Sequence, residues 1–238
     1  MQLNDDVHVL ELPMVRDGQT RILNLTCILD PSEGPTLVDT GLPGQLEAIT
    51  TALADAGVGL RDLRRIVLTH QDVDHVGSLP DLVEATGARV LASEVEVPYI
   101  DGTERPRYDR PEFLQAFPQM AGFLDRMKRM RVDEALADGA RLDIAGGVRA
   151  VATPGHTIGH LCLYLERTRT IIAGDALTAE EGRLQGPSPT ATADMPTAAR
   201  SVTRLAELDV DAIVCYHGGV VVDDAGGQLR RVAAELAP

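Results

Sequence analysis

The sequence has few cysteines, few basic residues and no long apolar run, and each shortage argues against a class of protein. Its three cysteines, Cys27, Cys162 and Cys215, lie far apart and form no CxxC pair. We therefore expect buried, reduced thiols rather than a disulfide framework. The chain carries 22 Lys and Arg against 36 Asp and Glu, a net charge of −14. This balance argues against a surface for nucleic acid or anionic membrane, because such partners require positive charge.

No segment approaches the roughly 18 apolar residues of a membrane span. The first residues, MQLNDDVHVLELP, lack the basic segment followed by an apolar run that marks a signal peptide. We expect a cytoplasmic protein that binds no membrane. Of the 238 residues, 44% are hydrophobic and 24% charged, as in soluble globular proteins. No repeat, low-complexity run or linker divides them, so we predict a single domain over residues 1–238.

Aromatic residues are also scarce, and most of them lie in one segment. Five of the seven fall within residues 97–137: Tyr99, Tyr108, Phe113, Phe117 and Phe123. Two interpretations stay open. These side chains pack a small local core, or the segment is a helical insertion that covers an apolar substrate pocket or makes a dimer contact.

The rest of the chain alternates between short apolar runs and amphipathic segments, the pattern of an α/β protein. Strands are predicted at residues 7–12, 21–30, 36–39, 66–68, 89–92, 148–152, 161–165, 170–173 and 210–214. Helices are predicted at about residues 44–56, 78–86, 194–208 and 223–236. The short connections between them favour one compact α/β arrangement.

The stretch RIVLTHQDVDHVGSLP, residues 65–80, joins a short apolar run to a dense polar loop. The run at 66–68 predicts a buried strand, and the loop then brings four possible metal ligands: His70, Asp72, Asp74 and His75. The simplest explanation is a polar loop after a buried strand. Two histidines and two aspartates so close together are unusual in such a loop, and they favour a metal site at the end of the strand.

Polar side chains follow other predicted strands in the same way. His156 lies in the loop TPGHTIGH, Asp175 follows a glycine, and His217 comes after the strand at 210–214. Four of the six histidines thus follow apolar segments, and a fifth, His160, lies nearby. Such repetition predicts that these side chains meet at one site.

The ordered set THQDVDHVG, TPGHTIGH, GD and YHGG, with LVDTG upstream, resembles the metallo-β-lactamase-fold superfamily. The resemblance covers about residues 7–236. It implies a four-layer αββα sandwich with a two-metal site at one edge. Residues 97–137 would then be a helical lid insertion in that fold.

The resemblance also implies roles for these residues. The implied ligands of metal one are His70, Asp72 and His156. Those of metal two are Asp74, His75 and His217, and Asp175 would bridge both ions. Asp39, Thr69 and His160 would hold the ligands through hydrogen bonds. Imidazole and carboxylate ligands suit two divalent ions, with zinc preferred and manganese or iron as alternatives.

One position departs from the family pattern, which places a second histidine two residues after the first. Here that residue is Asp72. Two divalent ions, one hydroxide and three carboxylates carry no net charge, whereas the usual set keeps one positive charge. The extra carboxylate is predicted to weaken Lewis acidity and to favour manganese or iron. On this hypothesis Asp72→His restores a preference for zinc, and unchanged metal selectivity in that variant would contradict it.

The function implied by the resemblance is metal-dependent hydrolysis of a small molecule. A hydroxide bridging the ions would attack a small ester, lactone, thioester or amide, while Asp74 orients it or passes on a proton. The expected substrate pocket is lined by Tyr99, Phe113, Phe117 and Ser188. A homodimer is left open. The alternatives are an iron-dependent redox enzyme acting on oxygen or a persulfide and, less favoured, a binding module that has kept the fold.

Overall fold

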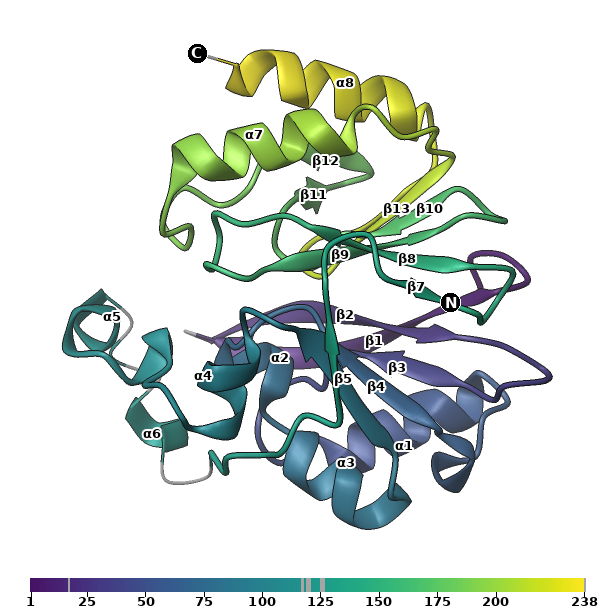
Figure 1. The fold of residues 1–238 in the computed structure, drawn as a ribbon, viewed down its shortest axis with the longest axis vertical. Coiled ribbons are helices and arrows are strands. Elements are labelled where there is room, and N and C mark those ends of the chain that lie inside the picture. Colours follow the sequence, from purple (N-terminus) through teal and green to yellow (C-terminus); the bar gives the residue numbers. More distant parts are fainter. Residues whose placement is uncertain (17, 117, 119–120, 125–126, 238) are drawn as a thin grey trace.

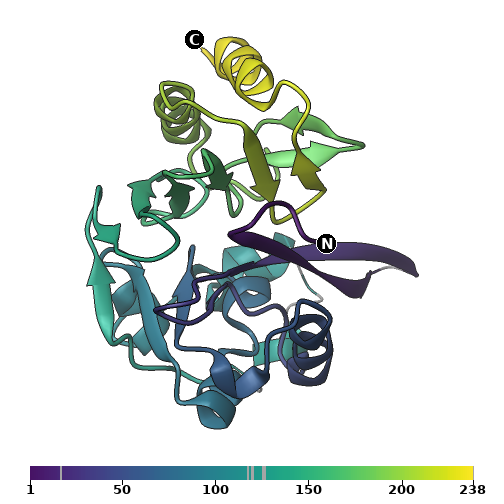
Figure 2. The ribbon, with the colours of Figure 1, turned by 90° about the vertical axis from the view of Figure 1, so that its right-hand side faces the viewer.

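The computed structural model describes residues 1–16, 18–116, 118, 121–124 and 127–237. In these ranges the chain forms two six-stranded β-sheets that face each other, with helices on the outer side of each sheet (Figure 1). A view turned by 90° shows the same order of layers (Figure 2). The arrangement confirms the α/β, four-layer αββα sandwich that the sequence predicts.

The first sheet runs in the order β1-β2-β3-β4-β5-β6. Its strands are β1 (Val7–Arg16), β2 (Gln19–Ile28), β3 (Thr36–Val38), β4 (Arg65–Leu68), β5 (Arg89–Ser93) and β6 (Glu134–Leu136). The strands from β1 to β3 pair antiparallel, and those from β3 to β6 pair parallel. Because parallel neighbours end at the same edge, β3 and β4 place their carboxyl ends side by side.

The second sheet runs in the order β14-β13-β10-β9-β8-β7. Its strands are β7 (Arg141–Leu142), β8 (Val148–Ala152), β9 (Leu161–Leu165), β10 (Thr170–Ile172), β13 (Ala212–Cys215) and β14 (Gly219–Val221). β9 pairs antiparallel with both β8 and β10, and β10 pairs parallel with β13. Three strands, β8, β10 and β13, therefore end at one edge. A separate hairpin joins β11 (Thr178–Glu180) to β12 (Arg183–Gln185).

The structure has three apolar cores, one between the sheets and one on the outer face of each sheet. They form because successive side chains of a strand point to opposite faces of its sheet. In β4, Ile66 packs on the outer face of the first sheet, whereas Val67 faces the second sheet. The core between the sheets joins Val67 and Leu91 of the first sheet to Leu163 and Val214 of the second. Each of these four side chains exposes at most 1% of its surface, so the two sheets are held together by dry apolar contact.

Helices cover the outer face of each sheet (Figure 1). The first sheet carries α1 (Leu46–Asp55) and α3 (Leu79–Thr86), and the second carries α7 (Met195–Leu205) and α8 (Ala225–Leu236). Apolar residues at helical spacing face the sheets: Ile49 and Leu53 of α1 are buried, as are Leu229 and Val232 of α8. Two shorter elements complete this part, η1 (Leu60–Asp62) and α2 (Val73–Val76).

The helical insertion contains α4 (Val97–Asp101), η2 (Arg107–Asp109), α5 (Pro111–Ala116) and α6 (Ala121–Leu124). It lies beside the first sheet (Figure 1). The last residues of the expected segment differ from the prediction, because 134–136 form β6 and pair with β5. Tyr108 is buried in the large outer core of the first sheet and not in a separate local core, and Phe117 lies outside the described residues. Whether the insertion also covers substrate or contacts a second copy stays a prediction.

Two further differences concern element ends. β1 runs past Pro13, where the sequence pattern ended the strand, because β1 is an edge strand and one of its sides needs no hydrogen-bond donor. The polar loop after β4 turns into α2 at Val73.

All three cysteines are free and buried, as predicted. Among the described residues, no helix is both long enough and apolar enough to cross a membrane.

Replacing Leu163 tests the core between the sheets. Leu163→Ala is expected to lower the free energy of unfolding by about 2–5 kcal/mol, because it leaves a cavity where the sheets meet. Urea denaturation measures the loss. Val222→Ala is the control, because Val222 is exposed. Equal stability of the two variants would show that the sheets are not held by this core.

Candidate metal centre

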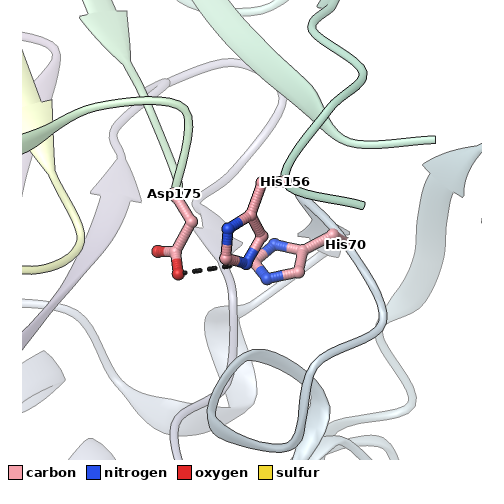
Figure 3. Close-up of side chains that lie close together, drawn as sticks. All are labelled: His70, His156 and Asp175. Carbon is pink, nitrogen blue, oxygen red and sulfur yellow. Dashed lines mark ion pairs between the residues drawn. The ribbon is translucent and has the colours of Figure 1, made fainter. Parts of the chain in front are cut away.

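The polar residues of the site follow the carboxyl ends of strands in both sheets. His70 comes two residues after β4, His156 follows β8, and Asp175 follows β10. Figure 3 shows these three side chains pointing toward one another. His217 follows β13, and Asp74 and His75 lie in α2, directly after the loop that carries His70. The structure therefore brings together six of the seven residues that the resemblance implies as ligands, and places the seventh, Asp72, at their edge.

Six of these side chains form two groups that each could hold a metal ion. The first group is His70, His156 and Asp175, and the second is Asp74, His75 and His217. In each group the ligand atoms lie within 4.8 Å of one another. Asp175 lies between the groups, with Oδ2 3.3 Å from His156 Nε2 and Oδ1 3.3 Å from His75 Nε2. Its carboxylate is thus within reach of both groups.

Three buried atoms of the site lack a hydrogen-bond partner among the described residues. They are the Nε2 atoms of His70 and His75 and the Oδ1 atom of Asp175. Buried polar atoms are nearly always paired, because an unpaired one costs about 1–3 kcal/mol. Imidazole nitrogen and carboxylate oxygen are also the atoms that divalent transition metals prefer. The donor set therefore fits metal ions.

Asp39 directs the two imidazoles of the loop after β4. Its carboxylate accepts hydrogen bonds from the Thr69 backbone N–H at 2.8 Å and from His75 Nδ1 at 2.9 Å. The Thr69 hydroxyl donates its single hydrogen to the same carboxylate, so its oxygen accepts from His70 Nδ1 at 3.0 Å. Both imidazoles thus carry a proton on Nδ1, which directs Nε2 of each ring to the place that a metal would take. Asp39 and Thr69 thus form hydrogen bonds with these imidazoles, and their role in supporting metal ligands, which the resemblance implies, stays a prediction.

His160 supports Asp175 instead of facing a metal. Its Nε2 accepts the Asp175 backbone N–H at 3.0 Å, and its Nδ1 donates to the Thr153 hydroxyl at 2.8 Å. Both ring nitrogens are therefore used within the protein. Only glycine fits at position 174, because φ is +49° and a Cβ would lie 2.7 Å from His160 Nε2. The dipeptide Gly174-Asp175 is explained by this close approach.

The crowding of imidazoles and carboxylates shifts their pKa values. Burial and the neighbouring His75 lower the pKa of His70 to about 4, so its imidazole is neutral at pH 7. Burial alone would lower the pKa of His75, but the carboxylates of Asp39, Asp175 and Asp74 outweigh burial and raise it well above its usual range. Burial would likewise raise the pKa of Asp175, yet His217, His75 and His156 hold it well below its usual range. The Asp175 carboxylate thus stays ionised and attracts cations.

Tyr216 packs beneath the second group. Its ring lies 3.8 Å from the ring of His75, centroid to centroid, and its hydroxyl donates to the main-chain oxygen of Asp74. The main-chain oxygen of Tyr216 in turn accepts the Asn24 backbone N–H at 2.9 Å. Tyr216, which follows β13 of the second sheet, therefore contacts β2 and the segment after β4, both of the first sheet.

Arg107 of the insertion, which the sequence analysis did not single out, reaches the site. Its Nε donates to Asp72 Oδ1 at 2.8 Å, and its Nη2 donates to Asp72 Oδ2 at 2.5 Å. Burial would raise the pKa of Asp72, but Arg107 and the imidazoles of His156 and His70 hold it well below its usual range. The carboxylate that departs from the family pattern is therefore ionised and paired with a guanidinium.

Glu96 is a second residue that the sequence analysis missed. Its side chain is fully buried and accepts three hydrogen bonds: from Thr157 Oγ1 at 2.7 Å, Gly159 N at 2.8 Å and Gln71 Nε2 at 2.8 Å. Burial raises its pKa. Because Gln71 belongs to the loop after β4 and Gly159 to the loop after β8, Glu96 ties together the two loops that carry His70 and His156.

Three of the four expected pocket residues lie in the described part of the chain. Phe113 is half-buried, and the Arg107 guanidinium lies 5.3 Å from the centre of its ring. Ser188 is half-buried in the loop that brings Thr192 to 3.5 Å from His156 Nδ1. Tyr99 is half-buried in α4, and Phe117 lies outside the described residues. The pocket assignment stays a prediction.

The comparison with protein families agrees with this geometry. The family model described as the metallo-beta-lactamase superfamily matches residues 25–217, which include every residue of both groups. The chain belongs to the metallo-beta-lactamase superfamily. The superfamily's fold and its binding of divalent metal ions therefore apply to this chain.

Relatives with curated names include several hydrolases. The chain is 30% identical to a probable metallo-hydrolase, YflN, of Bacillus subtilis, over 91% of this chain and 87% of that protein. It is 28% identical to the hydroxyacylglutathione hydrolase of Rhizobium meliloti, over 73% of this chain and 59% of that protein. The chain thus spans less than two thirds of the second relative.

Solved structures show the same fold. A metallo-beta-lactamase family protein of Thermus thermophilus superposes with a TM-score of 0.71 at 28% identity, over 99% of this chain and 79% of that one. A subclass B3 metallo-beta-lactamase of Bradyrhizobium japonicum superposes with a TM-score of 0.69 at 21% identity, over 99% of this chain and 89% of that one. The second likeness concerns the fold alone.

Asp39→Asn tests the hydrogen bond that directs His75. The asparagine NH₂ would donate where the carboxylate accepts, so the proton of His75 would move to Nε2, the atom that faces Asp175. Affinity for zinc is expected to fall by about 10- to 100-fold. Competition with a chromophoric chelator measures it.

Asp30→Asn is the matched control for this variant. The Asp30 carboxylate also accepts main-chain N–H groups, from Ser32, Glu33 and Ala145, but none of these partners belongs to the metal centre. The control is expected to bind zinc as the unaltered chain does. If Asp39→Asn also bound zinc unchanged, the assigned role of Asp39 would be wrong.

Proposed function

We propose that the chain is a metal-dependent hydrolase with a dinuclear site. The observation that carries the proposal is the set of three buried, unpaired atoms on His70, His75 and Asp175. These atoms lie on both groups of side chains that could hold an ion, with Asp175 between the groups. Two divalent ions would satisfy all three atoms. Membership of the superfamily and the hydrolase names of relatives support hydrolysis as the reaction class.

The proposed ligands follow the two groups. His70, His156 and Asp175 would hold one ion, and Asp74, His75 and His217 would hold the other, with the Asp175 carboxylate within reach of both groups. Zinc suits these nitrogen and oxygen ligands, and manganese or iron are the alternatives. When bound, the ions lower the pKa of a water from 15.7 towards about 7 and polarise the carbonyl of the substrate.

Asp74 is proposed as the catalytic residue that orients the attacking water and accepts its proton. Its Oδ2 lies 3.3 Å from His217 Nε2, and its side chain is 16% exposed. Burial would raise its pKa, but His75 and His217 outweigh burial and lower it. The carboxylate is therefore ionised and can accept a hydrogen bond from water. The hydrogen bond from Tyr216 to its main-chain oxygen holds the residue in place.

The proposed substrate is a small ester, lactone, thioester or amide with an apolar portion. Phe113 borders the site through Arg107, and the loop of Ser188 and Thr192 borders it next to His156. An aromatic ring and hydroxyl groups at the border of the site suit a substrate with an apolar part and a polar carbonyl group. The homodimer and the cytoplasmic location stay predictions.

The first test is the metal content of protein expressed with zinc, manganese and iron all available. Plasma mass spectrometry is expected to find about two ions of zinc or manganese per chain. A panel of esters, lactones, thioesters and amides then identifies the class that is hydrolysed. Activity should disappear with a chelator and return with the metal. A metal-free protein that cannot be reloaded would overturn the proposal.

The same measurement separates hydrolysis from redox chemistry. Two iron ions per chain, a visible absorption band and oxygen consumption would support the iron-dependent alternative on the same fold. Zinc or manganese without oxygen consumption would support the hydrolase.

Asp74→Asn tests the catalytic residue. The amide accepts no proton, so kcat is expected to fall by at least about 100-fold. Metal content is measured alongside kcat, because Asp74 is also a proposed ligand. Asp55→Asn at the exposed end of α1 is the control and should retain full activity. Full activity of Asp74→Asn would rule out the assigned role.

A further inference from the structure

Arg107 makes contacts at the first group that resemble those of a bound cation. Its Nη2 lies 2.5 Å from Asp72 Oδ2 and 3.2 Å from His156 Nε2, and its Nη1 donates to the main-chain oxygen of His156 at 2.6 Å. The Arg107 side chain is 14% exposed and the Asp72 side chain 8%. This is a nearly buried, two-bonded ion pair, the strong kind of arginine–carboxylate contact.

The atoms that Arg107 contacts are ones that a metal ion would also use. Asp72 Oδ2 lies 3.2 Å from His156 Nε2 and 3.5 Å from His70 Nε2, so the carboxylate borders the first group. An N–H of Arg107 points at the nitrogen of His156 that an ion would need. A nitrogen lone pair can serve a hydrogen bond or a metal, not both. Arg107 and an ion at the first group therefore exclude each other at His156.

Several contacts hold the guanidinium in this place. The Arg107 backbone N–H donates to Gln71 Oε1 at 2.8 Å, and Gln71 Nε2 donates to the buried Glu96 at 2.8 Å. The ring of Phe113 lies against the guanidinium, with 5.3 Å between its centroid and Cζ. The position of Arg107 is thus determined by the loop after β4 and by the insertion, and not by Asp72 alone.

We propose that Arg107 is an internal competitor for the metal position of His70, His156 and Asp175, so that this position binds a divalent ion much more weakly than that of Asp74, His75 and His217. The inference rests on the proposed function, since it concerns the same metal centre. While Arg107 pairs with Asp72 and donates to His156, only the His70 imidazole and the Asp175 carboxylate are left for the weaker ion.

The proposal gives Asp72 a different role, because it pairs with Arg107 instead of binding a metal ion. The charge count made from the sequence lacked Arg107, and the guanidinium restores the positive charge that the third carboxylate removes. Asp72→His alone would then leave Arg107 next to imidazoles and an ion without its counter-charge. Only removal of the arginine together with Asp72→His should give two strong positions, because a buried charge without its partner is destabilising.

Zinc titration of metal-free protein by calorimetry tests the proposal without any substrate. The unaltered chain is expected to bind one zinc ion tightly and a second at least about 100-fold more weakly, the range expected when a buried ion pair must be broken. In Arg107→Met the second ion should bind at least about 10-fold more tightly than in the unaltered chain. Asp72→His should lose the second ion, and Asp72→His with Arg107→Met should bind two ions tightly.

Arg110→Met is the matched control. Arg110 lies in the same insertion, but its guanidinium contacts only the main-chain oxygen of Arg105 among the contacts that the described residues show. The two zinc dissociation constants of Arg110→Met should equal those of the unaltered chain. Circular dichroism of each metal-free variant checks folding, and Arg107→Gln replaces Arg107→Met if the latter does not fold.

The outcomes separate this proposal from the proposed function. Two zinc ions with equal constants in the unaltered chain, unchanged by Arg107→Met or Arg107→Gln, would overturn the role of Arg107 and leave the hydrolase intact. If the two zinc dissociation constants differ in the unaltered chain and become similar in Arg107→Met, the role of Arg107 is supported, even if no substrate in the panel is hydrolysed. No zinc at either position would overturn both.

Discussion

The metal centre depends on how the two sheets are held against each other, because its imidazoles and carboxylates come from both. Main-chain hydrogen bonds join the sheets at this edge: Leu161 N donates to Thr69 O at 3.0 Å, and Asn24 N donates to Tyr216 O at 2.9 Å. The apolar core between the sheets sets their spacing. A slip of one sheet by an ångström would separate Asp175 from His75, which lie 3.3 Å apart, so fold stability and metal binding are linked.

Much of the fold could be predicted from the sequence because its strands are short apolar runs that end in polar residues. Ile66 to Leu68 followed by His70, and Ile171 followed by Gly174 and Asp175, mark both the strand and the edge where it ends. Pro13 concealed the length of β1, because the sequence does not show that β1 is an edge strand. β6 could not be predicted, since three residues after a helical insertion carry no periodicity.

The surroundings of Asp72 could be predicted only in part. The sequence shows a carboxylate where the family has histidine, but Arg105, Arg107 and Arg110 lie so close together that no pattern selects one of them. In the fold, Arg105 pairs with Asp109 at 3.5 Å, whereas Arg107 turns inward to Asp72. Glu96 was equally hidden, because a glutamate before a helix suggests an exposed residue. The roles of Arg107 and Glu96 can be assigned only from the three-dimensional structure.

The ring of Tyr216, stacked on His75, gives the chain a native optical signal. The sequence contains no tryptophan, so its near-ultraviolet emission comes mainly from four tyrosines. One of them lies 3.8 Å from an imidazole of the metal centre, centroid to centroid, and donates its hydroxyl hydrogen to Asp74. Any change of charge on that imidazole alters the electronic environment of the phenol directly. The emission wavelength and quantum yield of the protein's own fluorescence therefore report on the metal centre without a dye or label.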